Sequence, residues 1–340
     1  MVSATIKLSS GYEMPVVGLG TWQSKPGEVS KAVEAALLNG YKHIDCAHIY
    51  DNQKEIGQTL HKLFSEGKVK REDIFITSKV WNTFHSYEKA KSNIDTILSD
   101  LQLQYIDLLL IHWPTGFEEG GELLPKRTDG SNKMRYSDVD YLDTWKALEE
   151  AVEAKKVRSI GVSNFNHKQI ERVLEKAKIK PAVNQVELHP YFQQKKLRDF
   201  CQQHNIAVTA YRQSNLESAF ALVISMKISS SFSSLGNPGS AFFRKEGDPN
   251  VITDPVIKKI ADAHGKSTAQ VALRWAIQLG IIVIPKSVSE ERIKQNADLF
   301  DFNLTDAEMK EIGGLDQGWR IVSLKERDGD HAHYPFHEEY

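Results

Sequence analysis

Residues 43–50 read His-Ile-Asp-Cys-Ala-His-Ile-Tyr and continue a short apolar stretch that begins at Tyr41. We interpret the start of this segment as a buried β-strand. The strand ends at an acid, Asp45, and a phenol, Tyr50, follows five residues later. Apolar residues at near-helical spacing then predict a helix around residues 56–64. Taken alone, these residues allow an ordinary interpretation in which Asp45 caps that helix and Tyr50 is half buried. The same layout recurs along the chain, and the recurrence favours a functional interpretation.

Short apolar segments with the length of buried strands alternate with helical patterns along the chain. Apolar strands that alternate with helices indicate a parallel sheet covered by helices on its outer side. Eight such units predict a closed (β/α)8 TIM barrel in one domain spanning residues 1–340, with an N-terminal hairpin and long rim loops. The expected strands are residues 16–20, 41–44, 74–78, 106–111, 157–162, 182–184, 206–210 and 281–285. The expected helices cover residues 28–39, 56–64, 87–101, 141–155, 167–176, 194–204, 255–264 and 269–279, and a last one begins near Glu290.

Polar or aromatic side chains stand where the predicted strands end. In a barrel of this kind the carboxyl ends of all strands form one rim, and active sites are built there. Scattered polar residues would not fall at this one class of position so regularly. We therefore expect the side chains at the strand ends to converge on a site: Trp22, Asp45, Lys79, His112, Asn164, Gln185, Tyr211 and Lys286.

Composition narrows the classes of protein to consider. The chain has 340 residues, is 41% hydrophobic and 26% charged, and carries a net charge of -2. This near-neutral balance without a long basic run argues against a nucleic-acid partner. The N-terminal residues lack the apolar core of a signal peptide, and no apolar run reaches membrane-spanning length. Two distant cysteines, Cys46 and Cys201, are too few for a disulfide framework, so we expect a cytoplasmic protein.

The acid, the ammonium, the phenol and the imidazole at the rim together can make a proton donor. A free tyrosine has a pKa of about 10, and lowering it by two units requires roughly 3 kcal/mol. An ammonium at about 4 Å contributes on the order of 4 kcal/mol at an effective dielectric constant of 20. Lys79 is therefore expected to lower the pKa of Tyr50, while Asp45 keeps Lys79 charged and His112 orients a substrate oxygen. The alternative is a buried Asp–Lys pair that braces the barrel beside a core histidine.

A proton donor needs a partner reaction, and no side chain here offers hydride or electron chemistry, so a cofactor must supply it. The sequence Gly18-Leu19-Gly20 is a weak match to a dinucleotide-binding fingerprint because Gln23 stands where the third glycine belongs. A better anion site follows the last strand, where Lys286, Ser287, Ser289 and Arg292 gather near a helix N-terminus. Glu290 and Glu291 are the alternative partners of Arg292. Tyr211 offers a ring face for a heterocycle, and Ser163, Asn164 and Gln185 offer hydrogen bonds to an amide.

With these residues assembled, the chain resembles the aldo-keto reductases over nearly its whole length, most closely their aldose and aldehyde reductase branch. The resemblance is carried by several motifs in the family's order: residues 18–22 (Gly-Leu-Gly-Thr-Trp), 43–50, 76–79 (Ile-Thr-Ser-Lys), 109–113 (Leu-Leu-Ile-His-Trp), 161–165 (Gly-Val-Ser-Asn-Phe), 184–187 (Asn-Gln-Val-Glu), 284–287 (Ile-Pro-Lys-Ser) and 334–337 (Tyr-Pro-Phe-His).

The resemblance implies an enzyme that reduces aldehydes and ketones with NADPH. It implies that Tyr50 is the acid, that Asp45 and Lys79 tune it, and that His112 orients the carbonyl. The apolar substrate pocket would be walled by Trp22, Trp81 and Trp113 beside Tyr50 and His112, and closed by the long loop and the C-terminal tail. The implied cofactor-binding residues are Gly20, Thr21, Trp22, Asp45, Ser163, Asn164, Gln185, Tyr211, Ser233, Leu235, Lys286, Ser287, Val288, Arg292, Gln295 and Asn296. Lys286, Ser287 and Arg292 among them would bind the 2′-phosphate.

The chain departs from the family pattern after Tyr211. Twenty-one extra residues, numbered 212–232, separate Tyr211 from a Ser-x-Leu-Gly stretch at residues 233–236. In the family this stretch belongs to a loop that folds over the cofactor pyrophosphate, so the insertion puts cofactor affinity in doubt. Gln53 and Gln295 stand where the family often has Glu, and Gly239 where some members have an Asp that holds the loop. The tail histidines His331, His333 and His337 have no metal-site spacing, and we expect no metal.

Two other functions stay open at this point. Barrels often carry a reactive lysine, so a Schiff-base lyase is possible, although Asp45 would keep Lys79 charged and unreactive. The insertion favours a second alternative, a catalytically impaired barrel that binds the cofactor or regulates a partner. The expected partner is a small aldehyde or ketone, and we expect a monomer without a membrane or nucleic-acid partner. The physiological carbonyl and the direction of the reaction are left undetermined by the sequence.

Overall fold

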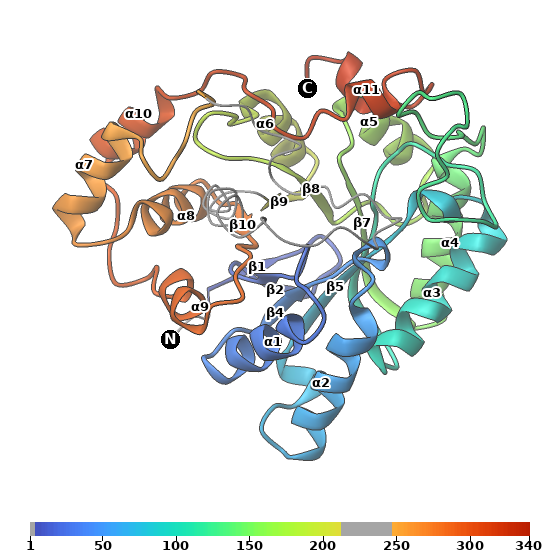
Figure 1. Ribbon diagram of the computed structural model, residues 1–340, viewed down its shortest axis with the longest axis horizontal. Coiled ribbons are helices and arrows are strands. Elements are labelled where there is room, and N and C mark those ends of the chain that lie inside the picture. The colour runs from blue at the N-terminus through green and yellow to red at the C-terminus, as the bar shows by residue number, and fades with distance from the viewer. Residues whose placement is uncertain (1–3, 212–246) are drawn as a thin grey trace.

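The computed structural model describes residues 4–211 and 247–340 of the chain. Eight parallel strands form one sheet in the order β10-β9-β8-β7-β6-β5-β4-β3 (Figure 1). The expected TIM barrel is therefore confirmed. The insertion at 212–232 lies outside the described residues. The strands are β3 (Leu19–Gly20), β4 (His43–Asp45), β5 (Phe75–Val80), β6 (Ile106–Ile111), β7 (Val157–Ser163), β8 (Val183–Glu187), β9 (Ala207–Tyr211) and β10 (Ile282–Val283).

The barrel closes between its first and last strands. Single parallel bridges join Val17 to Val283 and Gly20 to Lys286. A side chain at position 20 would have its Cβ only 2.8 Å from the carbonyl oxygen of Ile284, so the seam requires glycine there. The sequence predicted five-residue strands at both edges of the seam, whereas β3 and β10 have two residues each. The two strands are shorter than predicted because single bridges, and not a continuous hydrogen-bonded ladder, join them at the seam.

Helices surround the sheet, as Figure 1 shows, and from α1 to α5 and from α7 to α9 each helix packs on the next in chain order. Side-chain caps begin several of them: Asn166 and Gln169 form a capping box for α5, and Asp254 caps α7, where Pro255 occupies the first turn. The helices are α1 (Glu28–Leu38), α2 (Gln53–Ser65), α3 (Tyr87–Leu101), α4 (Tyr141–Glu153), α5 (His167–Lys176), α6 (Lys195–Gln203), α7 (Pro255–His264), α8 (Thr268–Gln278), α9 (Glu290–Ala297), α10 (Asp306–Gly313) and α11 (Lys325–Asp328). Short 3-10 turns are η1 (His48–Tyr50), η2 (Arg71–Asp73), η3 (Asn82–Phe84) and η5 (Pro335–His337).

The last part of the chain holds two helices that the sequence analysis did not expect, α10 and α11. The signal for α10 was present, because Thr305 and Glu308 form a capping box at its start. The four-residue helix α11 has no side-chain cap, because its N-cap residue Leu324 has no hydrogen-bond acceptor in its side chain. It lies in the C-terminal tail, whose position depends on contacts with distant residues.

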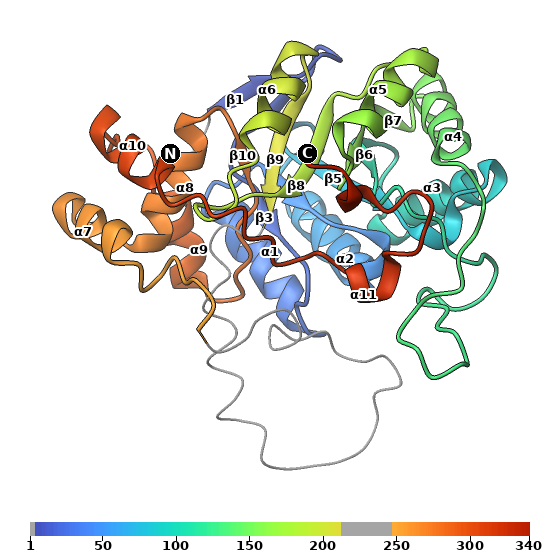
Figure 2. The ribbon, with the colours of Figure 1, turned by 90° about the horizontal axis from the view of Figure 1, so that it is seen from above.

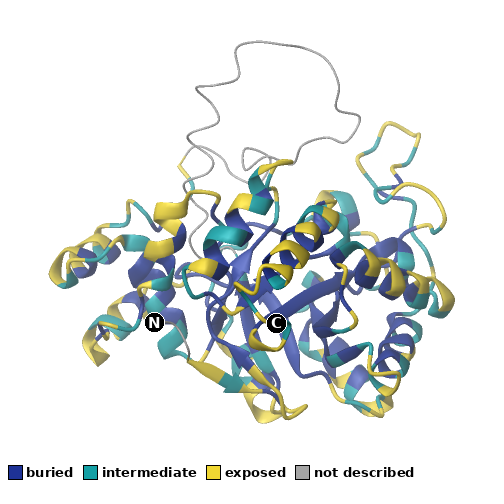
Figure 3. Ribbon diagram, turned by 90° about the horizontal axis from the view of Figure 1, so that it is seen from below, coloured by how far each residue is buried: buried dark blue, intermediate teal, exposed yellow. Residues whose placement is uncertain are grey.

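The N-terminal hairpin forms as expected and lies across one end of the barrel. Its strands β1 (Thr5–Lys7) and β2 (Glu13–Pro15) pair antiparallel. Leu8 and Met14 of the hairpin pack with Leu108 and Leu110 of β6 in one buried cluster. Figure 2 shows β1 at one end of the molecule and α11 at the opposite end. The barrel strands β3 to β10 are largely buried, and exposed residues gather on the hairpin, the outer helices and the loops (Figure 3). The hairpin end is therefore packed, which leaves the opposite rim for a site.

Candidate active site

Asp45, Lys79 and Tyr50 meet at the carboxyl end of the barrel. Lys79 Nζ donates to Asp45 Oδ1 at 2.6 Å and to the carbonyl oxygen of Cys46 at 2.9 Å, and it lies 3.4 Å from Tyr50 Oη. The side chains of Lys79 and Asp45 are 0% and 2% exposed. Helix α2 starts at Gln53, after Asn52, so Asp45 does not cap it. Because a buried ion pair is a poor source of stability, its place beside a phenol favours the functional interpretation.

The phenol of Tyr50 stays protonated in this environment. The side chain is only partly exposed. Burial, reinforced by the negative charge of Asp45, raises the pKa of Tyr50 well above its usual value. This direction is opposite to the one expected from the sequence. The difference arises first from burial of the phenol and second from Asp45, which offsets the ammonium charge of Lys79 that was to lower the pKa of Tyr50.

The ring of His112 contacts two aromatic residues of the rim, Tyr50 and Trp81. Its ring centroid lies 5.9 Å from that of Tyr50 and 5.2 Å from that of Trp81. Burial, together with the charges of Lys79 and Arg327, lowers the pKa of His112 well below its usual value. His112 is thus a neutral imidazole at pH 7, with one N–H to donate. The buried ring of Trp113 contacts Phe336 of the tail at 5.9 Å between centroids, and Trp22 is half buried on the loop after β3.

The four residues expected to hold an amide and a heterocycle form one hydrogen-bonded chain. Tyr211 Oη donates to Asn164 Oδ1 at 2.7 Å, and Asn164 Nδ2 donates to Ser163 Oγ at 3.1 Å. Ser163 Oγ donates to the carbonyl oxygen of Gln185 at 2.8 Å. Asn164 has a left-handed backbone, with φ of 62°, in which a non-glycine residue is uncommon. The structure therefore brings this predicted group together, as it does the four residues predicted to be catalytic, Asp45, Tyr50, Lys79 and His112.

Gln185 connects this group to the ion pair, a link that the sequence did not predict. Gln185 Nε2 donates to Asp45 Oδ2 at 2.8 Å, while Asp45 Oδ1 accepts from Lys79. Residues 45 and 185 lie on β4 and β8, so their contact crosses the barrel. Thr21 Oγ1 also donates to the carbonyl oxygen of Asp45, at 2.8 Å. Both oxygens of the carboxylate are thus fixed in direction by partners from different strands.

The expected phosphate site lies on the loop after β10 and the first turns of α9. Lys286 is half buried, and within the described ranges 4–211 and 247–340 it forms no ion pair. Burial lowers the pKa of Lys286. A partly desolvated ammonium near a helix N-terminus fits an anionic group, so these residues suit a phosphate. Ser287 and Asn296 are buried, and Val288, Arg292 and Gln295 are exposed. The predicted contacts Ser233 and Leu235, together with Gly239, lie outside the described residues.

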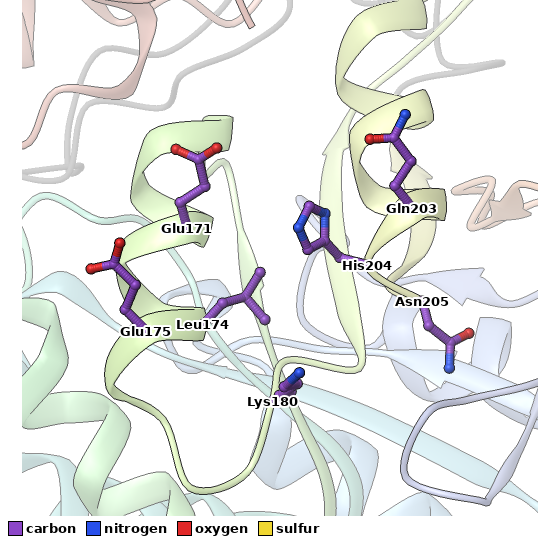
Figure 4. Close-up of a pocket in the computed structure, with 7 residues that line it drawn as sticks. All are labelled: Glu171, Leu174, Glu175, Lys180, Gln203, His204 and Asn205. Atoms are coloured by element: carbon purple, nitrogen blue, oxygen red, sulfur yellow. The ribbon is translucent and has the colours of Figure 1, made fainter.

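A separate groove of about 540 Å³ lies between α5 and α6 (Figure 4). Glu171 and Glu175 line one side and His204 the other, with Lys180 on the connecting loop. None of the residues of the predicted site lines it. Over residues 4–211 and 247–340, no three His, Cys, Asp or Glu side chains are placed to hold a metal ion. Among these residues, no helix combines the length and the apolar character that crossing a membrane requires.

Comparisons with known proteins show the family of the chain. The family model described as "Aldo/keto reductase family" matches residues 16–317. Aldo-keto reductase family 1 member A1 from Gallus gallus is 43% identical over 344 residues, with 98% of each chain covered. The Homo sapiens protein of the same name is 41% identical over 349 residues, with 100% of each covered.

Solved structures agree with these sequence relatives. An aldose reductase from Schistosoma japonicum superposes with a TM-score of 0.86 at 40% identity, covering 99% of this chain and 100% of the other. A Bombyx mori aldo-keto reductase in complex with NADP gives a TM-score of 0.83 at 33% identity, covering 98% and 99%. The chain therefore belongs to the aldo/keto reductase family of NADP(H)-using oxidoreductases.

Proposed function

We propose that this protein reduces aldehydes and ketones to alcohols with NADPH, and that Tyr50 is the proton donor. The observation that carries the proposal is the position of Lys79 Nζ, which lies 2.6 Å from Asp45 and 3.4 Å from the Tyr50 hydroxyl. NADPH, when bound, supplies the hydride for the carbonyl carbon. Tyr50 Oη gives its proton to the carbonyl oxygen and regains one from solvent. The raised pKa of Tyr50 keeps that proton in place until the oxygen becomes basic.

His112 and Lys79, the neighbours of Tyr50, have different roles in the reaction. The neutral His112 donates an N–H to the carbonyl oxygen and orients it toward Tyr50. Lys79 stabilises the phenolate that proton loss leaves behind, because its ammonium stands 3.4 Å away. Since Asp45 and a carbonyl oxygen hold that ammonium, Lys79 is poorly placed to attack a carbonyl, which argues against the Schiff-base alternative. The rings of Trp22, Trp81 and Trp113 give the substrate site apolar walls.

The cofactor would be held along the rim from the site to α9. Ser163, Asn164 and Gln185 would bind its carboxamide, and Tyr211 would stack on the nicotinamide. Asn164 Oδ1, which accepts from Tyr211, has a second lone pair with which it could accept from the carboxamide. Lys286, Ser287 and Arg292 would bind the 2′-phosphate, with Gln295 and Asn296 beside them. We also propose that residues 1–340 form a single domain that acts as a monomer in the cytoplasm.

The test is NADPH consumption with a panel of aldehydes and ketones, for the wild type and two variants. Tyr50→Phe should lower the turnover number by about a hundredfold to ten-thousandfold, the usual range for a general acid. Its dissociation constant for NADPH should stay within twofold, because the phenol contributes little to cofactor binding. Tyr12→Phe is the matched control, since Tyr12 is 43% exposed on the hairpin at the opposite end of the barrel. Near wild-type turnover in Tyr50→Phe would refute the assignment of the acid.

A further inference from the structure

Arg320 lies in the segment that leads into the C-terminal tail, outside every motif identified in the sequence. Its guanidinium carbon is 3.6 Å from the ring centroid of Phe336 and 4.3 Å from that of Phe192. Phe336 belongs to the tail, whereas Phe192 lies on the loop between β8 and α6. We call Phe192, Arg320 and Phe336 the aromatic clamp. Arginine stacks well on ring faces because its planar cation is weakly hydrated.

The backbone on either side of Arg320 is fixed to β8 and to the loop that follows it. The amides of Ile321 and Val322 donate to the buried carboxylate of Glu187 at 2.7 and 2.8 Å. On the other side, the amide of Trp319 donates to the carbonyl oxygen of Tyr191 at 3.0 Å. Bonds to a carboxylate are stronger than neutral ones, so this segment is a rigid base for the Arg320 side chain.

The stacked rings are the contacts that hold the guanidinium. Within residues 4–211 and 247–340, Arg320 has no side-chain hydrogen bond and no close ion pair. Glu187 acts on it only through its charge. The far ring of the clamp, Phe336, packs edge-on against Trp113 at 5.9 Å. A continuous row of contacts therefore runs from Phe192 through Arg320 and Phe336 to Trp113.

We propose that Arg320 is a positioning residue that fixes Phe336 against Trp113 and so sets the width of the substrate pocket. The proposal rests on the function proposed above, in which Trp113 walls that pocket. Without the cation between them, Phe192 and Phe336 lose their shared partner, and the tail segment that carries Phe336 moves more freely. Large apolar substrates depend on this wall for binding, whereas the chemistry at Tyr50 does not. The Michaelis constant should therefore respond more strongly than the turnover number.

The kinetic test compares Arg320→Met, Arg320→Lys and Phe336→Leu with a bulky aromatic aldehyde and a short aliphatic aldehyde, both uncharged. Arg320→Met should raise the Michaelis constant for the bulky aldehyde about fivefold to tenfold, the loss expected for a partly desolvated cation–π contact. The turnover number, the dissociation constant for NADPH and the Michaelis constant for the short aldehyde should stay within twofold. Arg320→Lys should give an intermediate Michaelis constant for the bulky aldehyde, since lysine keeps the positive charge but lacks the planar guanidinium group. Phe336→Leu should change the constants in the same direction as Arg320→Met.

Lys168→Met is the matched control, because Lys168 forms an exposed ion pair with Glu338 of the same tail. It removes a cation that contacts the tail without touching the clamp, so both Michaelis constants should be unchanged. Unaltered constants in Arg320→Met, or equal losses with both aldehydes, would overturn the proposal. A third substrate, a bulky aldehyde that carries a carboxylate, tests for charge recognition. A raised Michaelis constant for this substrate alone would also overturn the proposal, because Arg320 would then bind the carboxylate.

Hydrogen exchange separates failure of this proposal from failure of the proposed function. Amides of residues 331–340 should exchange at least fivefold faster in Arg320→Met than in the wild type or in Lys168→Met, because the clamp orders the tail. This measurement needs no turnover. If the wild type consumes no NADPH with any aldehyde, the proposed function fails while the exchange result still decides whether Arg320 orders the tail. Equal exchange in all three proteins would refute the clamp.

Discussion

Lys79 donates a 2.6 Å hydrogen bond to Asp45 where both side chains are almost completely buried, although the two residues come from different strands. Asp45 accepts from Gln185 with its second oxygen, and Lys79 bonds the carbonyl oxygen of Cys46. The polar atoms of the pair are therefore well satisfied despite their burial. Removing one partner would leave an uncompensated charge, which is far more costly than exchanging the whole pair for apolar groups.

Asp45→Asn should therefore destabilise the fold by roughly 3–5 kcal/mol and abolish turnover. Asp107→Asn is the matched control, because Asp107 is a buried carboxylate that pairs with Arg71 at 2.6 Å and with Arg158 at 3.0 Å, outside the predicted site. Urea unfolding should show a loss of stability in both variants, but only Asp45→Asn should lose its turnover number. If Asp45→Asn folds and turns over like the wild type, the ion pair only braces the barrel.

Lys286→Met should weaken NADPH binding by about tenfold to a hundredfold, the worth of one charge-assisted contact to a phosphate. NADH lacks the 2′-phosphate, so its dissociation constant should change by less than twofold. Fluorescence titration of both cofactors measures the two constants. Lys294→Met is the control, since Lys294 sits on the same helix, α9, in an exposed pair with Glu290. Parallel weakening of NADPH and NADH would show that Lys286 does not bind the 2′-phosphate.

Acid should destabilise the protein through His85, a buried residue at the end of η3. Burial, with smaller contributions from His331 and His333, lowers the pKa of His85 to about 3. The unfolded chain protonates its histidines near pH 6.5, so between pH 6.5 and 3 it binds more protons than the folded state. This contribution to stability is complete above about pH 6.5 and is lost at roughly 1.4 kcal/mol per pH unit below it.

His85→Leu removes this titration. Between pH 6.5 and 5, the free energy of unfolding of the variant should therefore fall by about 2 kcal/mol less than that of the wild type. Urea unfolding at the two pH values gives the difference directly. His61→Leu, at an exposed position on α2, should keep the pH dependence of the wild type. Identical pH dependence in all three proteins would exclude His85 as the source of acid sensitivity.

The insertion at residues 212–232 should weaken cofactor binding. Closure entropy makes a longer loop inexpensive, at about 0.6 kcal/mol for each doubling of length, so the barrel should fold with or without it. A longer tether should order the covering loop after Tyr211 less well, and the apolar run at residues 219–224 must either be buried or stay exposed. Deleting residues 212–232 should therefore strengthen NADPH binding and slow its release, as measured by fluorescence quenching. Unchanged or weaker binding after deletion would mean that the insertion is neutral or functional.

The sequence by itself determined the barrel and the class of position where the site lies. Alternation of apolar strands with helices is a local pattern. The polar residues at the ends of those strands, such as Asp45 and Lys79, can be identified within each strand–helix unit separately. A closed parallel barrel puts all these ends on one rim, so convergence follows once the fold is known. The four proposed catalytic residues did meet, and so did the group from Ser163 to Tyr211.

Only the tertiary structure decided the electrostatics of the site and the anchoring of the tail. The direction in which the pKa of Tyr50 moves depends on how completely Asp45 offsets Lys79 and on how deeply the hydroxyl is buried. Both quantities arise from distances between strands that no local pattern encodes. Arg320 meets Phe192 and Phe336 from three separate segments, and Gln185 reaches Asp45 across the barrel. Contacts of this kind form only when the closed barrel and the packed tail bring distant residues within van der Waals range.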